Sequence, residues 1–374
     1  MGIVSVCKVP EYRAELLDQA IEQHFSRIHA EEIIRPGMRV LLKPNLVRGC
    51  RPDAAVTTRA EILTAVCKKL RSMGVSDIVI ADSPGGLYTP AALHSIYSVS
   101  GLKALSEYAE LNQNVGWKQV FCPEGFKNRT FNIIEPILEA DVVINVAKLK
   151  THGMTMLSAG IKNLFGSIPG LQKPEMHYRY PELEAFSSML CELAKFVNPA
   201  ITILDAIDCM EGNGPTGGTV RHMGLTMASR NVFEQDAYAS SLIGLAPENV
   251  AMLRIAKERG WYDSSELQVI GDPAEPANPP FRLPDTAGAD FSGALPGFMR
   301  GPASKVLKKI FHTVPKVNKA KCVGCGKCAE SCPPQIIRIV NGKAVFTARG
   351  CISCFCCQEM CPARAIEVRR ILRL

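Results

Sequence analysis

Eight cysteines near the C-terminus constrain this 374-residue chain more than any other feature. They form two copies of C-x-x-C-x-x-C-x-x-x-C-P, the first ending at Pro333 and the second at Pro362. Three thiolates at intervals of three residues can surround one iron–sulfur cube, and the fourth cysteine of this spacing ligates the other cluster. The sequence therefore predicts a small C-terminal domain that folds around two [4Fe–4S] clusters.

The spacing predicts that the two clusters exchange one ligand each. One cluster is expected to bind Cys322, Cys325, Cys328 and Cys361, and the other Cys351, Cys354, Cys357 and Cys332. Thiolates are soft ligands that suit iron–sulfur cores. Cys356 lies beside a ligand but out of register. We expect it to pack against the cluster, and a spare ligand or modification site is the alternative.

Structural zinc and disulfides are the other uses of paired cysteines. Zinc takes four ligands per site, which explains neither the third cysteine of each motif nor the proline. Disulfides belong to oxidising compartments, and the other seven cysteines of this chain show no pattern. We therefore favour iron–sulfur ligation. Residues 314–374 resemble bacterial-type ferredoxins that carry two clusters.

Length and composition place the chain among soluble proteins. A chain of 374 residues is expected to form roughly two domains. No stretch approaches the ~18 apolar residues that a membrane helix requires, and the first residues lack the basic and apolar regions of a secretory signal. We expect a cytoplasmic protein with no membrane span.

The net charge of +7 is unevenly distributed. Residues 314–374 hold eleven Lys or Arg and three Asp or Glu, a balance of +8, so the remainder carries 7 − 8 = −1. This surplus either compensates the anionic clusters or steers an acidic redox partner protein. No nucleic-acid-binding motif is present and the basic residues lack interleaved aromatics, so we expect no nucleic-acid partner.

Residues 1–272 alternate between strand-like and helix-like segments, which is typical of an α/β domain. Apolar runs predict strands at 40–42, 78–80, 142–144 and 201–204. Helical periodicity predicts helices at 14–29, 182–197 and 231–243, and Thr58 with Glu61 predicts a capping box that opens another. Apolar strands between helices indicate a largely parallel sheet covered on both faces.

Residues 273–313 read as a Pro/Gly-rich linker followed by a short basic helix around 305–311. Residues 314–374 read as a small α+β, ferredoxin-like two-cluster domain.

Polar side chains follow several of the predicted strands. They are Lys43 and Asn45 after the first strand, Asp82 after the second, Lys148, Lys150 and His152 after the third, and Lys162 and Asn163 in a helix end capped by Gly166. Ligands of open α/β sheets bind beyond the carboxyl ends of the strands. Four lysines there would repel one another unless an anion lay between them, and crowding lowers lysine pKa values, which suits proton transfer. The alternative is that each lysine simply ends a strand in solvent.

A glycine-rich loop follows the strand that ends near Asp205. Gly212, Gly214 and Gly217 match G-x-G-x-x-G, but a dinucleotide fingerprint must open a helix and residues 219–227 read as extended. We expect these glycines to let the backbone turn tightly beside a ligand. Asp205, Asp208 and Glu211 would bind a metal, balance the lysines or remain in solvent.

These stretches resemble the family catalogued as domain of unknown function 362, some of whose members carry ferredoxin modules. The matching stretches are LLKPNLV (41–47), IADSPGG (80–86), VINVAKLKTHGMT (143–155), AGIKNLFG (159–166), the segment around His177, and ILDAIDCMEGNGPTGG (203–218). The resemblance spans roughly residues 1–272. The resemblance identifies the domain but implies no particular reaction. Its motifs fall on Lys43, Asn45, Asp82, Lys150, His152, Lys162, Asn163, His177, Asp205, Glu211 and Gly212.

Three hypotheses of function follow. In the preferred one, an iron–sulfur oxidoreductase passes electrons from its clusters to a small anionic substrate or a further cofactor. Lys43, Lys150 and Lys162 would clamp the anion, Asn45 and Asn163 would orient it, and His152 or His177 would supply protons; Asp82, Lys148, Asp205, Glu211 and Gly212 complete the predicted site. The alternatives are a non-catalytic electron carrier whose α/β domain docks partners, and a ligand-binding redox sensor.

Overall fold

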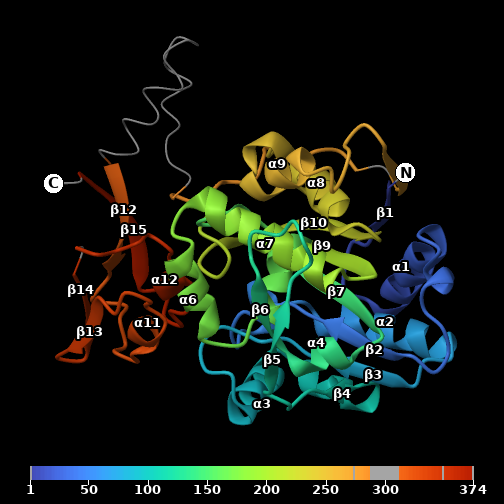
Figure 1. Cartoon of the computed structure of the whole chain (residues 1–374), viewed down its shortest axis with the longest axis horizontal. Helices are drawn as coiled ribbons and strands as arrows, with labels where there is room; N and C mark the ends of the chain where they lie inside the picture. The colour runs from blue at the N-terminus through green and yellow to red at the C-terminus, as the bar shows by residue number, and fades with distance from the viewer. Residues whose placement is uncertain (1, 273, 287–310, 348, 373–374) are drawn as a thin grey trace, which may run out of the picture.

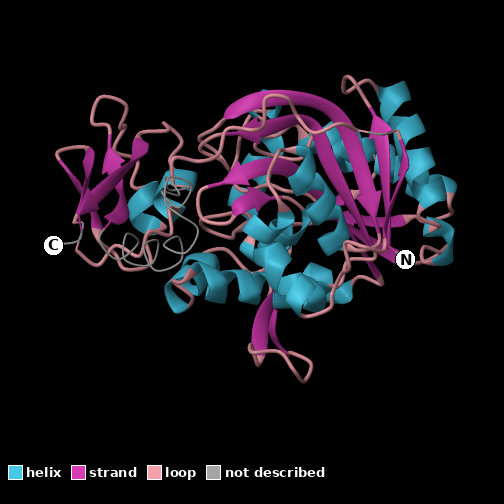
Figure 2. Cartoon of the chain, turned by 90° about the horizontal axis from the view of Figure 1, so that it is seen from above, coloured by secondary structure: helices cyan, strands magenta, loops and turns pink. Residues whose placement is uncertain are grey.

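The computed structural model describes residues 2–272, 274–286, 311–347 and 349–372. An α/β domain fills most of the molecule, and a small cysteine-rich lobe lies against one end of it (Figure 1). The second view shows the same arrangement (Figure 2). No helix among the described residues combines the length and the apolar character that crossing a bilayer would require.

A mixed, mostly parallel sheet of nine described strands forms the centre of the α/β domain, in the order β11-β1-β10-β9-β7-β2-β3-β4, with β8 paired to β7. The strands are β1 (Gly2–Lys8), β2 (Arg39–Lys43), β3 (Asp77–Ile80), β4 (Glu110–Leu111), β7 (Val142–His152), β8 (Met156–Ser158), β9 (Ile201–Glu211), β10 (Thr219–Ser229) and β11 (Leu267–Gly271). Antiparallel pairs join β10 to β1 and β9, and β8 to β7. The separate β5 (Trp117–Phe121) and β6 (Thr130–Ile134) form an antiparallel ribbon.

Helices cover both faces of the sheet, as the sequence predicts. They are α1 (Ala14–Arg27), α2 (Ala60–Ser72), α3 (Pro90–Val99), α4 (Glu135–Glu139), α5 (Gly160–Asn163), α6 (Gln172–Arg179), α7 (Leu183–Val197), α8 (Val232–Leu242) and α9 (Ala251–Glu258). Alternate residues of a strand point to opposite faces. In β2, Val40 and Leu42 join the core beneath α1 and α2, whereas Leu41 joins the core beneath α7 and α8.

Two strands are longer than predicted. The expected strand 142–144 continues to His152, and the expected strand 201–204 continues to Glu211. Lys148, Lys150 and His152 therefore lie within β7, and Asp205 lies within β9 rather than ahead of a loop. These polar residues can occupy buried strands because their side chains find partners on neighbouring elements.

Two predicted helix caps are wrong, and a side chain caps the start of α8. No side chain caps α2, which begins at Ala60; the Thr58 hydroxyl instead donates to the Val146 carbonyl (2.7 Å), and Glu61 pairs with Arg59. The Asn231 side chain does cap α8 by accepting the Phe233 N–H. Gly166, predicted as a helix cap, lies inside a 3₁₀ turn over Leu164–Ser167, where a Cβ would come within 1.9 Å of Asp82.

Two short helices and two strand pairs form the C-terminal lobe. Strands β12 (Phe311–Val317) and β15 (Ile366–Leu372) pair antiparallel, as do β13 (Ile337–Val340) and β14 (Lys343–Phe346). The helices are α11 (Lys327–Glu330) and α12 (Cys356–Glu359), one in each cysteine motif. The predicted basic helix falls mostly on residues 305–310, outside the described residues, and position 311 begins β12.

Candidate functional site

Two cavities of the C-terminal lobe are each lined by four cysteines. Cys322, Cys325, Cys328 and Cys361 line one, and Cys332, Cys351, Cys354 and Cys357 line the other. These are the two sets that the crosswise spacing specifies. Backbone N–H groups of Ala344 and Ala365 point at Cys322 Sγ (3.4 Å) and Cys361 Sγ (3.2 Å), and the hydrogen bond from Ala344 lowers the pKa of Cys322.

The arrangement of the cysteines fits iron–sulfur clusters rather than single metal ions. All fifteen cysteines lie in the described residues, and none is in a disulfide. Among the residues that the structure describes, no three His, Cys, Asp or Glu side chains converge where one ion could bind them. Zinc would need four ligands within about 2.3 Å of one point. A cubane instead separates its thiolates, each on a different iron, and the two cavities suit that arrangement.

A crevice runs between the α/β domain and the C-terminal lobe, and we call it the interdomain crevice. The lobe contributes Ser331, Cys356, Glu359 and Met360, and the α/β domain contributes polar side chains of Asn45, Asp82, Ser83, His152, Ser158, Lys162, Asn163, Lys173 and His177. Its interior volume is about 90 Å³, several times the roughly 10–15 Å³ that one water needs on the same measure. Cys356 thus lines this crevice and neither cysteine cavity.

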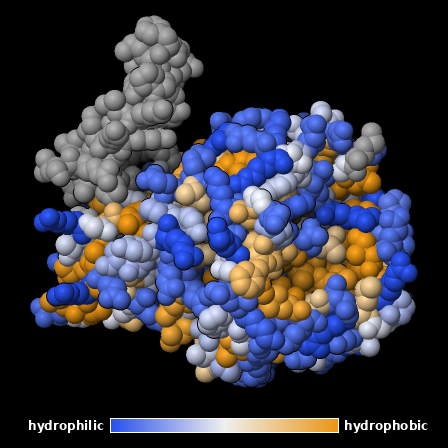
Figure 3. All heavy atoms as spheres, in the orientation of Figure 1, coloured by the Kyte–Doolittle hydropathy of each residue, from blue (hydrophilic) through white to orange (hydrophobic). Residues whose placement is uncertain are grey.

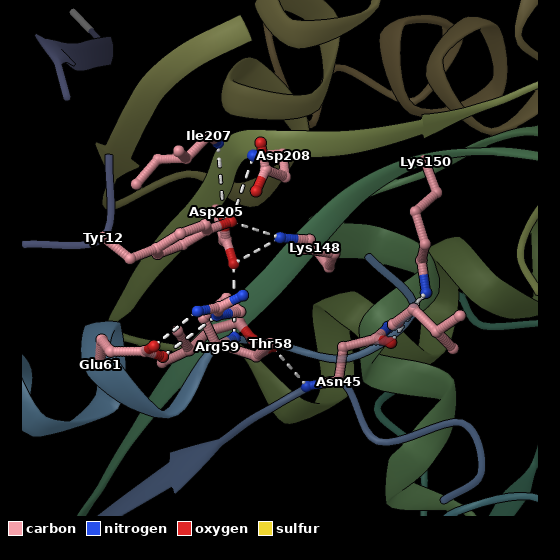
Figure 4. Close-up of polar contacts among 12 residues, drawn as sticks. Tyr12, Asn45, Thr58, Arg59, Glu61, Lys148, Lys150, Asp205, Ile207 and Asp208 are labelled. Atoms are coloured by element: carbon pink, nitrogen blue, oxygen red, sulfur yellow. Dashed lines mark hydrogen bonds and ion pairs between the residues drawn. The ribbon is translucent and has the colours of Figure 1, made fainter. Parts of the chain in front are cut away.

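Two of the predicted lysines are paired with carboxylates. Lys43 Nζ lies 2.6 Å from Asp82 Oδ1, and Lys148 Nζ lies 2.8 Å from Asp205 Oδ2. The Tyr12 hydroxyl joins the second pair, accepting from Lys148 and donating to Asp205 (Figure 4). Asp82 and Asp205 therefore balance two of the four lysines within the protein, and these two need no bound anion.

Lys150 and Lys173 are buried without a carboxylate partner. Lys150 Nζ donates to Asn45 Oδ1 (2.9 Å) and to the Val56 carbonyl (2.7 Å), as Figure 4 shows for Asn45. Lys173 Nζ donates to Ser83 and to the Ile168 carbonyl. Burial, together with the charge of neighbouring lysines, lowers the pKa of each ammonium group to about 7. Both lysines can therefore gain or lose a proton near neutral pH.

Lys162 is the lysine that the fold leaves available. Among the described residues its Nζ has no hydrogen-bond partner, and it lies 4.6 Å from the centre of the Phe165 ring. Burial lowers the pKa of Lys162, while Glu359 opposes that shift. A half-buried ammonium over an aromatic ring, at the wall of a crevice, can bind an anion at its free side.

His152 meets a carboxylate from the C-terminal lobe. Its Nδ1 accepts the N–H groups of Met154 (3.1 Å) and Thr155 (3.3 Å). Its Nε2 lies 3.2 Å from Glu359 Oε1, although the two groups are not aligned as a hydrogen bond. Burial lowers the pKa of His152 despite this carboxylate. Burial alone would raise the pKa of Glu359, but His152 and Lys162 lower it to about 2.

His177 lies in α6 and faces the same crevice. Its ring stacks on Phe186 with centroids 4.1 Å apart, and its Nδ1 has no hydrogen-bond partner. Burial, followed by the nearby Lys162, lowers the pKa of His177 to about 3. The imidazole is therefore neutral at physiological pH. His177 is therefore helical and buried rather than part of an exposed loop.

The remaining predicted residues have other positions. The Asn163 amide donates to Asn145 (2.7 Å) and the Lys43 carbonyl (3.2 Å), so it braces strands beside the crevice. Glu211 lies away from it, paired with Arg221 (3.0 Å) and Arg282 (2.8 Å). Lys43 and Lys150 lie behind Asp82 and Asn45, and the Lys148–Asp205 pair forms a separate network.

The glycine-rich loop after β9 contacts the C-terminal lobe. Gly212 has a φ of +76° and accepts the Thr151 hydroxyl through its carbonyl (2.8 Å). Further along, Pro215 lines the crevice and the Thr216 hydroxyl donates to the Glu359 carbonyl (3.0 Å). The extended β10 follows, so the loop opens no helix. Its tight turns position the loop against α12.

Sequence reasoning missed Lys173 and Glu359. Lys173 carries no motif signal, because a lysine in a short polar helix normally faces solvent. Glu359 stands two residues after Cys357, where the first motif has Glu330 after Cys328. That repeat makes both glutamates look like ordinary surface residues of the cluster fold.

Fold and site together define an α/β protein joined to a ferredoxin-type module. Residues 314–362 match the family model described as 4Fe-4S dicluster domain, and the chain binds two [4Fe–4S] clusters. Residues 40–241 match the model described as Domain of unknown function (DUF362), and the chain belongs to this family. Both matches fall inside the predicted ranges 1–272 and 314–374.

The chain is also similar to individual proteins. The chain is 34% identical over 235 residues to the thylakoid-associated protein sll1697 of Synechocystis sp., covering 60% of this chain and 69% of that protein. It is 48% identical over 29 residues to Ferredoxin-2 of Desulfomicrobium norvegicum, covering 8% of this chain and 49% of that protein. The lactate racemase apoprotein of Thermoanaerobacterium thermosaccharolyticum aligns with a TM-score of 0.39 and 14% identity, over 63% of this chain and 58% of that one. This last similarity is too low to carry an argument.

Proposed function

We propose that the protein is an iron–sulfur oxidoreductase that delivers electrons to a small anionic substrate, or to a further cofactor, in the interdomain crevice. Its ferredoxin-type module supplies electron transfer in one-electron steps. Lys162 would bind the anion, Lys150 would add positive charge from behind, and the neutral His152 or His177 would transfer protons.

One observation carries the proposal: a single short helix forms a wall of both the cluster site and the crevice. Helix α12 presents Cys357 to a cysteine cavity and Cys356 with Glu359 to the crevice. The backbone carbonyl of Glu359 accepts hydrogen bonds from Arg48 (3.1 Å) and Thr216 (3.0 Å), which fix this helix to the α/β domain. An electron leaving that cluster would therefore have a short path to a bound molecule.

We assign the cluster ligands in the same proposal. Cys322, Cys325, Cys328 and Cys361 would hold one cluster, and Cys332, Cys351, Cys354 and Cys357 the other, supported by the two cavities. The first set is the more open, because Cys325 is exposed and its neighbour Val323 is 67% exposed. We infer that electrons enter there from a redox partner protein.

The surface of the lobe favours such a partner. Hydrophilic and hydrophobic residues lie side by side on its visible face (Figure 3). Exposed Lys321 and Lys327 flank the open cluster edge in sequence. This surface also supports the second candidate, a carrier that moves electrons between proteins and performs no chemistry in the crevice.

Substitution of the crevice lysines separates the two candidates. In the anaerobically purified holoprotein, Lys162→Ala and Lys150→Ala should lower the rate at which reduced clusters pass electrons to the substrate by at least about tenfold, as expected for a lost charge-assisted contact. Lys195→Ala, at an exposed position of α7, is the matched control. If both crevice variants keep full reductive activity with unchanged cluster spectra, the electron-carrier function is correct instead.

A further inference from the structure

Three buried polar atoms of the interdomain crevice lack hydrogen-bond partners. They are His152 Nε2, His177 Nδ1 and Glu359 Oε1, and they come from β7, α6 and α12. The side chains of His152 and His177 are 1% and 3% exposed. Buried polar groups are normally satisfied, and leaving one unpaired is costly. Three such atoms around one cavity indicate that a bound molecule supplies their partners.

The donors among these groups can be identified. Nδ1 of His152 accepts two backbone N–H groups, so the proton of this neutral ring must be on Nε2, which therefore donates into the crevice. Lys162 is donor-only and likewise has no hydrogen-bond partner among the described residues. These two groups call for oxygen acceptors, preferably with negative charge.

The unpaired oxygen of Glu359 requires a hydrogen-bond donor instead. A carboxylate accepts hydrogen bonds and repels other anions, and Oε1 of Glu359 accepts none in this structure. The nearby His152 Nε2 is at 3.2 Å but is misaligned for a hydrogen bond. An anion made only of acceptor oxygens would place like charges together here. An anion with its own O–H group could donate to Oε1 and remove that conflict.

We propose that the crevice selects small oxyanions that carry an O–H donor, and that Glu359, supplied by the ferredoxin-type lobe, performs the selection. This rests on the proposed function, in which the crevice holds the anionic substrate, and it adds the substrate class. Two sources share this chemistry: hydrogen phosphate, and a carboxylate with a neighbouring hydroxyl. Lys162 and His152 Nε2 bind the charged oxygens, and Oε1 accepts the hydroxyl proton in a hydrogen bond.

Equilibrium binding to the anaerobic holoprotein tests the selection directly. Calorimetry would compare phosphate with sulfate, and glycolate with acetate, because the members of each pair differ mainly in the O–H donor. We expect the donor-bearing member of at least one pair to bind about tenfold tighter or more, which is the scale of leaving a buried acceptor unpaired. If only the phosphate–sulfate pair shows selectivity, the ligand is an inorganic oxyanion. If only the glycolate–acetate pair shows it, the ligand is a hydroxycarboxylate.

Glu359→Gln should remove the preference, because the amide can donate to an acceptor oxygen. Sulfate or acetate should then bind within about twofold of its donor-bearing counterpart. The control is Glu330→Gln, at the corresponding position of the first cysteine motif, where the side chain is exposed; it should keep the wild-type preference. Cluster absorbance would confirm loading, and if Glu359→Gln does not load, the wild-type comparison decides alone.

Several results would overturn the inference. Equal binding within both wild-type pairs would do so, as would no binding of any of the four anions, or loss of preference in Glu330→Gln. If the protein binds both members of each pair equally but reduces some acceptor in a Lys162-dependent way, this inference is wrong and the proposed oxidoreductase function stands. Selective binding without any Lys162-dependent reduction would remove the oxidoreductase and leave the selection.

Discussion

The two cysteine motifs are near-copies in sequence but have different surroundings. Each carries a glutamate two residues after its third cysteine, Glu330 in the first and Glu359 in the second. Glu330 is exposed, whereas the Glu359 side chain is only 17% exposed and faces His152. The same cluster-binding framework can therefore present one motif to solvent and the other to a neighbouring domain. The equivalent position therefore faces solvent in one copy and is part of a candidate site in the other.

The comparison extends to the residue before the third cysteine. Lys327 occupies it in the first motif and is exposed; Cys356 occupies it in the second and is buried against the crevice. A lysine before the third cysteine suits a surface that meets partners, and a small apolar thiol suits a packed wall. Under the proposed function, these differences would suit the first motif to electron entry and the second to electron delivery.

The prediction with the largest expected effect tests which cysteines of the second motif bind a cluster. Cys357→Ser should remove one cluster, lowering iron from about eight to about four atoms per chain, because it deletes a ligand. Cys356→Ser, one residue away, should keep about eight. Iron and sulfide analysis with electron paramagnetic resonance would measure both variants. Retention of all the iron in Cys357→Ser, or loss of a cluster in Cys356→Ser, would contradict the ligand assignment.

The next prediction, with a smaller expected effect, concerns the pH dependence of anion binding in the interdomain crevice. Burial lowers the pKa of Lys173 to about 7, with Asp82 opposing the shift and Lys43 and Lys162 adding to it. A bound anion favours the protonated lysine, so anion affinity should fall as pH rises through about 7, by at most about tenfold per pH unit per lysine. Glycolate is the suitable probe, because its carboxyl group titrates far below this range.

Lys173→Gln should flatten this pH profile, and exposed Lys195→Gln should leave it unchanged. Lys150 has a similarly lowered pKa but lies behind Asn45, so part of the slope should remain. Affinity of the wild-type protein that is constant from pH 6 to pH 8 would show that neither lysine responds to the anion.

The sequence predicted what depends on local pattern and missed what depends on pairing across the fold. Cysteine spacing specified both sets that line the cavities, and apolar runs located β2 and β3. The same approach ended β7 too early, because Lys148 and Lys150 look like solvent residues until Asp205 and Asn45 are placed beside them. Glu359 could not be separated from Glu330, since only docking against the α/β domain makes their environments differ.

The smallest expected effect concerns the solvent-facing motif. Lys321→Glu combined with Lys327→Glu should slow electron transfer from an acidic donor such as a flavodoxin several-fold at low ionic strength, because long-range attraction raises association rates. The difference should shrink as salt is added, since exposed charges are screened over about 10 Å at 0.1 M salt. Stopped-flow reduction of the clusters would measure the rates. Lys118→Glu on β5, 65% exposed, combined with Lys195→Glu at an exposed position of α7, makes the same change in net charge away from the lobe. Equal slowing by this control pair would show that the first motif is no special entry point. Glycolate affinity should stay constant in all of these variants, because their charges lie outside the crevice.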